Sequence, residues 1–282
     1  MSPLPDTPAE DSRTSVVIVN YRTKELARAA VQSVLAEPRV GEVVVVDNAS
    51  GDGSTDFLRR AVDDPRVRIV ESSMNRGFGP GVNLGVAQST LPLVLVLNSD
   101  AALRPGSLEP LIACLTARDD TGLVAPAVYA ADGRTLQWGA YGELPRRRDI
   151  LLGRRSEGLL GRRDLSHESP EWVSGAAMLI RRVDFEAMGG FDERFEMYFE
   201  DLDLCRRLRA PGSMVRRCPE AAVVHRVGGS WQSDIEKRRR FHASKLVYYE
   251  KLGASRLELH YVRMVGAARL WLTERGWWRP PL

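Results

Sequence analysis

Residues 15–47 read SVVIVN-YRTKELARAAVQSVLAEPRVGE-VVVVD, and this stretch decides the fold class. It predicts a strand over 15–20, a helix over 23–36 with Thr23 as its N-cap, and a second strand over 43–47. The apolar residues in both strands are continuous rather than alternating. Continuous runs indicate parallel strands that are covered on both faces.

The same alternation continues toward residue 100. The sequence predicts a helix over 54–62, a strand over 67–71, a helix over 81–88 and a strand over 93–97. Strands interleaved with helices predict an α/β sheet. Ligands on such sheets bind at the carboxyl ends of the strands. Three strands are followed there by polar residues: Asn20-Tyr21, Asp47-Asn48 and Asn98-Ser99-Asp100. The plain alternative is that polar residues only end these strands.

The composition of the chain excludes some classes of function and of cellular location. The chain has 282 residues, 44% of them hydrophobic, and a net charge of +3, which does not call for nucleic acid as a partner. Its three cysteines have no CxxC spacing, which fits a reducing compartment better than a disulfide framework or a zinc site. Residues 1–13 predict a disordered tail and no signal peptide, and the apolar runs are strand-sized. We therefore expect a cytoplasmic protein without a membrane span.

An acidic segment lies in the second half of the chain, where residues 189–207 read GGFDERFEMYFEDLDLCRR. Carboxylates among aromatic side chains are costly unless they bind a cation, a sugar hydroxyl or an arginine. Desolvation also raises the proton affinity of a carboxylate, which suits a general base. With Asp100 at the end of an upstream strand, the segment predicts a metal site and a base on one scaffold.

Two segments rich in small residues follow the second and third strands. They read DNASGDGST at 47–55 and NRGFGPGVNLG at 75–85. Glycines allow the backbone to approach a ligand closely, and Ser54 could cap the next helix. Neither segment matches a dinucleotide fingerprint or a P-loop, since the Gly-Lys-Ser/Thr ending is missing.

The ordered motifs VDNAS (46–50), NRGFG (75–79), NSD (98–100), WVSGAAMLI (172–180), YFEDLDLCR (198–206) and HRVGGS (225–230) resemble those of the family 2 inverting glycosyltransferases. The resemblance is nearest to bacterial rhamnosyltransferases and galactofuranosyltransferases, and it covers roughly residues 15–231. It implies the GT-A fold, with a mostly parallel, Rossmann-like sheet flanked by helices. The expected organisation is a GT-A domain over 14–232 followed by a helical extension over 233–282.

The resemblance also implies roles for individual residues. Asp201, with Glu200 beside it, matches the acid that acts as base, and Asp100 matches the residue that holds a divalent cation, Mn²⁺ or Mg²⁺. His225 matches a histidine that completes the metal site in some relatives. Nucleotide binding falls on Asn20, Tyr21, Asp47, Asn48, Ser50, Asn75, Gly77, Asn83, Asn98 and Ser99, and the donor and acceptor pocket falls on Trp172, Ser174 and Gly175.

The implied reaction is metal-assisted single displacement. A sugar, with rhamnose as one candidate, would move from a nucleotide-diphosphate sugar to a hydroxyl of a glycan, a lipid-linked or a natural-product acceptor. Two other classes remain open. A nucleotidyltransferase would need a Gly-rich loop after the first strand, where this chain has Tyr21-Arg22-Thr23-Lys24. A non-catalytic nucleotide-sugar-binding protein should have lost Asp100 or Asp201.

For several of these residues a structural role remains an alternative to a functional one. Asp203 and Arg207, four residues apart, predict an ordinary ion pair on a helix surface. His225 could be structural, and Trp172 could belong to the core rather than stack on a sugar.

Seven arginines within 145–163 predict either a solvated loop or a flap over a lipid pyrophosphate acceptor. The basic and Trp-rich stretch 233–282 could contact a membrane at its inner face, form a homodimer contact, or pack back onto the domain.

Overall fold

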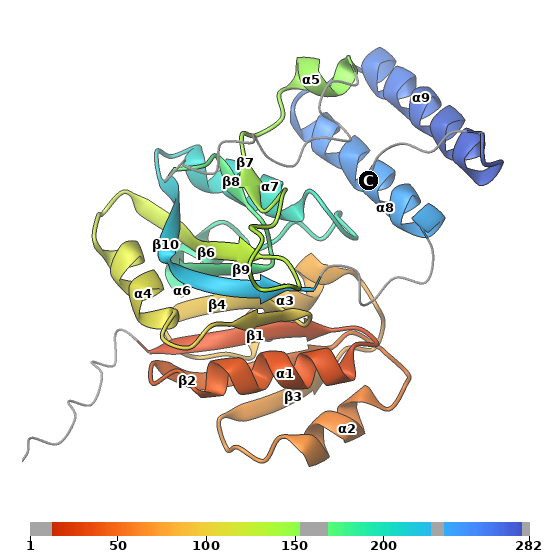
Figure 1. Cartoon of the computed structure of the whole chain (residues 1–282). Coiled ribbons are helices and arrows are strands. Elements are labelled where there is room, and N and C mark those ends of the chain that lie inside the picture. Colours follow the sequence, from red (N-terminus) through yellow and green to blue (C-terminus); the bar gives the residue numbers. More distant parts are fainter. Residues whose placement is uncertain (1–12, 153–168, 227–233, 278–282) are drawn as a thin grey trace, which may run out of the picture.

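The protein was analysed as a computed structural model, which describes residues 13–152, 169–226 and 234–277 (Figure 1). Its centre is an eight-stranded sheet with the strand order β3-β2-β1-β4-β9-β6-β10-β5. The expected α/β fold class, with a mostly parallel sheet flanked by helices and with helices at the C-terminal end, is confirmed.

The first half of the sheet follows the sequence pattern closely. β1 pairs in parallel with β2 on one side and β4 on the other, and β2 pairs with β3. Every residue of β1 is buried, as a strand covered on both faces requires. The elements are β1 (Thr14–Asn20), α1 (Lys24–Leu35), β2 (Val40–Asp47), α2 (Ser54–Ala61), β3 (Val67–Glu71), α3 (Phe78–Ala87) and β4 (Leu93–Asn98).

Three details at the helix starts differ from the prediction. α3 begins at Phe78, three residues before the expected start. Thr23 does stand at the N-cap of α1, but its side chain caps nothing and donates instead to Asn20 Oδ1 at 3.0 Å. Gly53, not Ser54, occupies the N-cap of α2.

The second half of the sheet mixes strand directions. β9 lies between β4 and β6 and is antiparallel to both, while β10 runs parallel to β6. A short strand, β5, pairs antiparallel with the end of β10. The remaining elements up to residue 225 are β5 (Ala101–Leu103), α4 (Leu108–Thr116), β6 (Thr121–Tyr129), β7 (Tyr141–Gly142), α5 (Arg147–Leu151), β8 (Trp172–Val173), β9 (Ala177–Arg181), α6 (Arg182–Ala187), α7 (Glu200–Arg209) and β10 (Met214–His225).

Two helices complete the described chain, α8 (Asp234–Lys251) and α9 (Arg256–Glu274), and Figure 1 shows them beside α5. α8 packs firmly on the domain, since Tyr248 and Tyr249 are fully buried. α9 crosses α8 at Gly266, where an added Cβ would lie 1.8 Å from the His242 ring. Within the described ranges, no helix has both the length and the apolarity needed to cross a membrane.

Candidate active site

The carboxyl ends of three neighbouring strands share one buried network of polar side chains. Asn20 Nδ2 donates to Asp47 Oδ1 at 2.8 Å, and the two residues lie opposite each other in the register of β1 and β2. Ser50 Oγ donates to the same oxygen at 2.6 Å, and Ser50 N donates to Asp47 Oδ2 at 3.1 Å. Thr23 Oγ1 joins Asn20 to Ser99 Oγ, which lies 2.9 Å away at the end of β4.

The loop before α3 closes against this network and against the acidic segment. Asn48 Nδ2 donates to Asn75 Oδ1 at 3.0 Å and to Gly77 O at 2.8 Å. Gly77 has φ +101°, and a Cβ there would lie 1.9 Å from the backbone oxygen of Glu196. Only glycine fits this position, so the contact brings the loop after β3 against the segment that leads to α7.

Asp100 and His225 meet because β5 and β10 pair at their ends. His225 lies opposite Ala101 in that register, and His225 Nε2 is 3.0 Å from Asp100 Oδ1. Gln137 Oε1 lies 3.0 Å from His225 Nδ1, and a hydrogen bond from Nδ1 to this oxygen would leave the lone pair of Nε2 on the side of the carboxylate. Asn98 Nδ2 lies 3.3 Å from Nε2.

This arrangement fits a cation, since Asp100 Oδ1 is buried without a hydrogen-bond partner and faces a ring nitrogen of His225 at 3.0 Å. The described residues contain no group of three or more His, Cys, Asp and Glu side chains placed to hold a metal. The pair would therefore supply one carboxylate and one imidazole ligand to a bound cation.

A short turn between β8 and β9 connects this pair to the acidic segment. Gly175 N donates to Asp201 Oδ2 at 3.2 Å, and the neighbouring Ala176 O accepts from Asn98 N at 3.0 Å. Ser174 Oγ accepts from Ala176 N within the same turn. Three consecutive residues thus lie between the end of β4 and the first turn of α7.

The two carboxylates at the start of α7 differ in their surroundings. Burial raises the pKa of Asp201 to about 6, although backbone amides of Gly175 and Leu202 hydrogen-bond to its charged form and oppose the rise. Burial, and the charge of Asp201 next to it, raise the pKa of Glu200 well above its ordinary value. Glu200 Oε2 is buried without a hydrogen-bond partner. Glu200 is therefore the more readily protonated of the two carboxyls, and Asp201, with a pKa of about 6, is ionised at pH 7.

The backbone just before these carboxylates is strained. Tyr198 and Phe199 have φ values of +66° and +67°, which aromatic residues rarely adopt. Each such residue costs of order 1–3 kcal/mol and persists only where the surroundings fix it. Here α8 supplies the support, since Phe241 lies 5.6 Å from the Tyr198 ring and 5.1 Å from the Phe199 ring, and Tyr248 lies 5.4 Å from Phe199.

The structure thus gathers most of the residues singled out by sequence at one edge of the sheet. Tyr21 lies beside them, half-buried, with the Arg22 guanidinium 5.2 Å from its ring centre. Motif residues 227–230 and the arginines at 154, 155, 162 and 163 lie outside the described residues.

Three expectations need correction. Trp172 is 1% exposed, so its ring belongs to the core and offers no face to a sugar. Asn83 hydrogen-bonds through both side-chain atoms to the backbone of Phe191, which leaves it a structural role. Asp203 does pair with Arg207 at 2.7 Å, yet it is fully buried rather than on a helix surface. Lys251 of α8 lies 2.7 Å from its other oxygen.

Two residues of the site were missed from the sequence. Thr23 was expected only as a cap, and Gln137, which orients His225, was not noticed. Both contacts join residues far apart in the chain, 76 positions for Thr23 and Ser99 and 88 for Gln137 and His225. No local spacing could have shown either of them.

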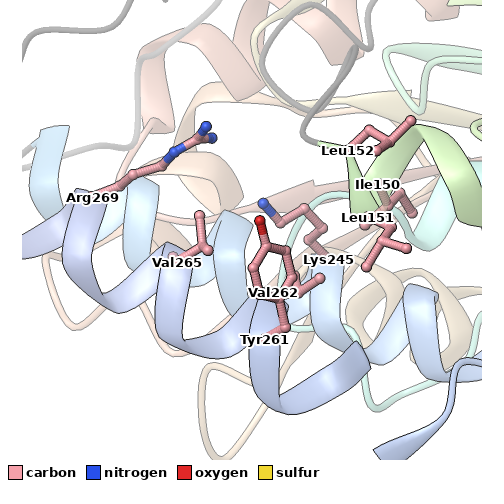
Figure 2. A pocket seen from close by; sticks show the side chains of 9 residues that line it. Ile150, Leu151, Leu152, Lys245, Tyr261, Val262, Val265 and Arg269 are labelled. Atoms are coloured by element: carbon pink, nitrogen blue, oxygen red, sulfur yellow. The ribbon is translucent and has the colours of Figure 1, made fainter. Parts of the chain in front are cut away.

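A pocket also lies away from this edge, between α5, α8 and α9 (Figure 2). Its walls are mostly apolar, and Figure 2 shows Lys245 and Arg269 among them. No residue of the polar edge of the sheet lines it. It is therefore separate from the candidate active site.

The fold and the site geometry define a glycosyltransferase of the GT-A class. The chain belongs to the family described as "Glycosyl transferase family 2", whose model matches residues 15–185. This match confirms the resemblance drawn from the motifs and leaves the nucleotidyltransferase and non-catalytic alternatives without support.

Individual relatives agree with that assignment. The chain is 29% identical to the N-acetylglucosaminyl-diphospho-decaprenol L-rhamnosyltransferase of Mycobacterium tuberculosis, over 95% of this chain and 87% of that protein. Among solved structures, it matches a mannosyltransferase from Pyrobaculum calidifontis in complex with GDP-Man and Mn²⁺, with a TM-score of 0.58, 18% identity, and coverage of 99% and 80%. It also matches GalNAc-T7 with UDP, GalNAc and Mn²⁺, with a TM-score of 0.61 and 17% identity, over 84% of this chain and half of that one.

Proposed function

We propose that this glycosyltransferase moves a sugar from a nucleotide-diphosphate sugar to an acceptor hydroxyl by single displacement, with inversion at the anomeric carbon. The observation that carries the proposal is the turn at residues 174–176. Through its backbone this turn contacts Asp201 on one side and the end of β4, next to Asp100 and His225, on the other. The proposed base and the proposed cation-binding pair would therefore lie on opposite sides of residues 174–176, as a displacement requires.

The network at the ends of β1 and β2 would bind the nucleoside. Asp47 accepts three hydrogen bonds from Asn20 and Ser50, and a carboxylate has about four acceptor positions. One position remains for an N–H of the base, and Tyr21 would line the base pocket. Asn48, Asn75 and Gly77 form the adjoining wall, while Asn98 and Ser99 lie toward the diphosphate.

Asp100 and His225 would hold a divalent cation on the diphosphate. A bound cation supplies Lewis-acid stabilisation of the negative charge that grows on the leaving group. The imidazole in the pair favours Mn²⁺ over Mg²⁺. Gln137, by accepting a hydrogen bond from Nδ1, would leave Nε2 of His225 free of a proton and able to bind the cation.

Asp201 would be the general base. Its carboxylate accepts from two backbone amides and has a pKa raised to about 6, which keeps it ionised at neutral pH yet more basic than a solvated aspartate. Glu200, whose burial raises its pKa well above the ordinary value, is the less suited of the two carboxyls to take the proton as a carboxylate.

Rhamnose is the proposed donor sugar and a lipid-linked glycan the proposed acceptor, because the mycobacterial relative, matched over almost the whole chain, has that activity in its name. An acceptor in a lipid layer also implies that the protein works at the cytoplasmic face of a membrane. Natural-product aglycones stay the alternative acceptors.

The proposal is tested by calorimetry and by turnover. Asp100→Ala should abolish the Mn²⁺-dependent part of nucleoside-diphosphate binding, and His225→Ala should weaken it less. Circular dichroism of both variants should show an unchanged fold. Affinity that is equal in the wild type and Asp100→Ala, with Mn²⁺ present, would refute the cation assignment.

Turnover should be measured as release of nucleoside diphosphate from a nucleotide-diphosphate rhamnose. A short-chain N-acetylglucosaminyl-diphospho-lipid serves as the acceptor, and a soluble aglycone serves as the comparison. Transfer to the aglycone alone would overturn the lipid-linked acceptor while leaving the reaction type in place.

A further inference from the structure

An exposed row of apolar side chains runs along α9. Leu257, Met264 and Trp271 follow one another at intervals of seven residues, and Tyr261 lies between the first two. Their exposed fractions are 84%, 56%, 45% and 54%. A period of seven residues drifts by only about 20° on a helix, so the row keeps to one face over roughly 21 Å. We call these four residues the α9 row.

The other side of α9 is already occupied. Val262 and Gly266 are the buried residues of this helix, and Gly266 lies directly against the His242 ring of α8. Leu259 also packs on the core cluster. The core-facing side of α9 is the one that carries Val262, Gly266 and Leu259. The α9 row therefore lies on the solvent-facing side, where an amphipathic helix would ordinarily be polar.

The charges around the row are mainly basic. Arg256, Arg263 and Arg275 are exposed beside it. The two acids of α9 already have cationic partners, Glu258 in Arg147 and Glu274 in Arg239. Residues 234–277 contain ten Lys and Arg and five Asp and Glu, an excess of five that is larger than the net charge of +3 of the whole chain.

α5 extends the same surface from a distant part of the sequence. Leu152, just after α5, is 61% exposed and lines the same pocket as Tyr261 of the row (Figure 2). Arg146 and Arg148 are exposed on the neighbouring stretch. The described part of the arginine-rich segment and the aromatic C-terminal helix thus lie at one surface (Figure 1).

We infer that the α9 row, with Leu152, is a docking surface for an anionic lipid bilayer. A bilayer supplies both partners that this surface needs, since its acyl boundary accepts a row of Leu, Met and aromatic side chains and its phosphates meet the flanking arginines. Tyr and Trp suit this boundary because each has an apolar body and a polar tip. A second copy of the chain fits less well, because it would bring the same arginines against these.

This inference concerns a surface outside the active site and does not rest on the proposed reaction. It is tested with the full chain and vesicles, in the absence of donor and acceptor. Phosphatidylcholine vesicles should bind weakly, and vesicles that also contain 30% phosphatidylglycerol, roughly the anionic content of a charged leaflet, should bind strongly. The bound fraction should fall as salt is added.

Two sets of variants separate the apolar and the charged parts. Leu257→Ser, Met264→Ser and Trp271→Ser together should reduce vesicle affinity by at least about tenfold. Arg256→Ser and Arg263→Ser should each reduce affinity for anionic vesicles by about fivefold and leave affinity for neutral vesicles unchanged. Val183→Ser is the matched control, since Val183 is 67% exposed on α6 and should not affect binding.

Circular dichroism shows whether the triple variant is folded, and the single variant Leu257→Ser, at the most exposed position, provides a milder test. Equal binding of the wild type to neutral and anionic vesicles, no binding at all, or wild-type binding by the folded triple variant would each overturn the inference. Sedimentation equilibrium without vesicles would also overturn it if the wild type were a dimer and the triple variant a monomer.

Discussion

Asp201 has a half-buried carboxylate that accepts hydrogen bonds from two backbone amides, those of Gly175 and Leu202. Asp201→Asn keeps the shape and an acceptor for the Gly175 amide but cannot take a proton. Transfer should fall by about two to four orders of magnitude while donor binding persists. Rate assays and calorimetry on the same preparation measure the two effects.

The same substitution should stabilise the fold. At pH 8 the wild-type protein carries a buried charge at Asp201, and an amide removes that cost, so the thermal midpoint should rise. Asp203→Asn is the control, because it weakens a buried ion pair and should lower the midpoint with a smaller effect on transfer. The opposite pattern in the two variants would place the base at Asp203.

The pH dependence of transfer follows from the raised pKa of Asp201. Below pH 6 the carboxyl of Asp201 is protonated and cannot take the proton from the hydroxyl of the acceptor substrate. The value of kcat/KM should therefore fall as the pH is lowered, with a midpoint near 6. Glu200→Gln should leave this midpoint in place, since burial and backbone hydrogen bonds, not Glu200, set the pKa of Asp201. A midpoint near 4 in the wild type would show that Asp201 is solvated.

The residues whose position at the edge of the sheet could be predicted from the sequence are those that follow a strand or begin a helix. Asn20, Asp47 and Asp100 follow apolar runs, and parallel strands bring such positions to one edge whatever else the chain does. Gln137 and Thr23 could not be predicted, because their roles depend on which side chain lies across a contact. Trp172 was ambiguous for the same reason, since burial is decided by what covers it.

Among the elements, α8 does more than extend the domain. Lys251 near its end lies 2.7 Å from both Asp192 and Asp203 and is 14% exposed. The Arg194 hydrogen bond and Lys251 together hold the pKa of Asp192 well below its usual range. This helix therefore supplies a cation to the acidic segment in addition to the rings that support Tyr198 and Phe199.

Removal of that cation should be costly. Lys251→Met leaves the buried Asp203 with only its arginine partners and should destabilise the protein by about 3 kcal/mol in chemical denaturation. Lys237→Met is the matched control, as it lies fourteen residues earlier on α8, about 20 Å along the helix. A loss that is equal in the two variants would mean that the Lys251 contacts contribute nothing specific.

Among the strands, the sequence predicted the parallel half of the sheet but not the half in which strand directions are mixed. Continuous Val and Leu runs identified β1, β2 and β4 because most of their residues are buried, whereas β3 is a partly exposed strand at the edge of the sheet. β9 is similar in composition, yet it enters antiparallel between β4 and β6. Strand direction is set by the path of the connecting segments, which local composition does not record.

The two C-terminal helices should differ in what their removal does to the molecule. α9 contributes Val262 and Gly266 to the buried set, whereas α8 contributes the fully buried Tyr248 and Tyr249. A chain that ends at Gly253 should fold with a lower thermal midpoint and lose binding to anionic vesicles. A chain that ends before α8 should not fold, as circular dichroism would show. Cooperative melting of this shorter chain would contradict the buried role of α8.

The uneven distribution of charge along the chain should affect how fast the protein associates with a charged surface. An excess of five positive charges in residues 234–277, in a chain with a net charge of +3, leaves a net charge of −2 on the rest. Such a separation is an electric dipole, and a negatively charged surface exerts a torque on it before any contact forms. The protein should therefore arrive with its C-terminal helices foremost, and its association rate constant should rise as ionic strength is lowered.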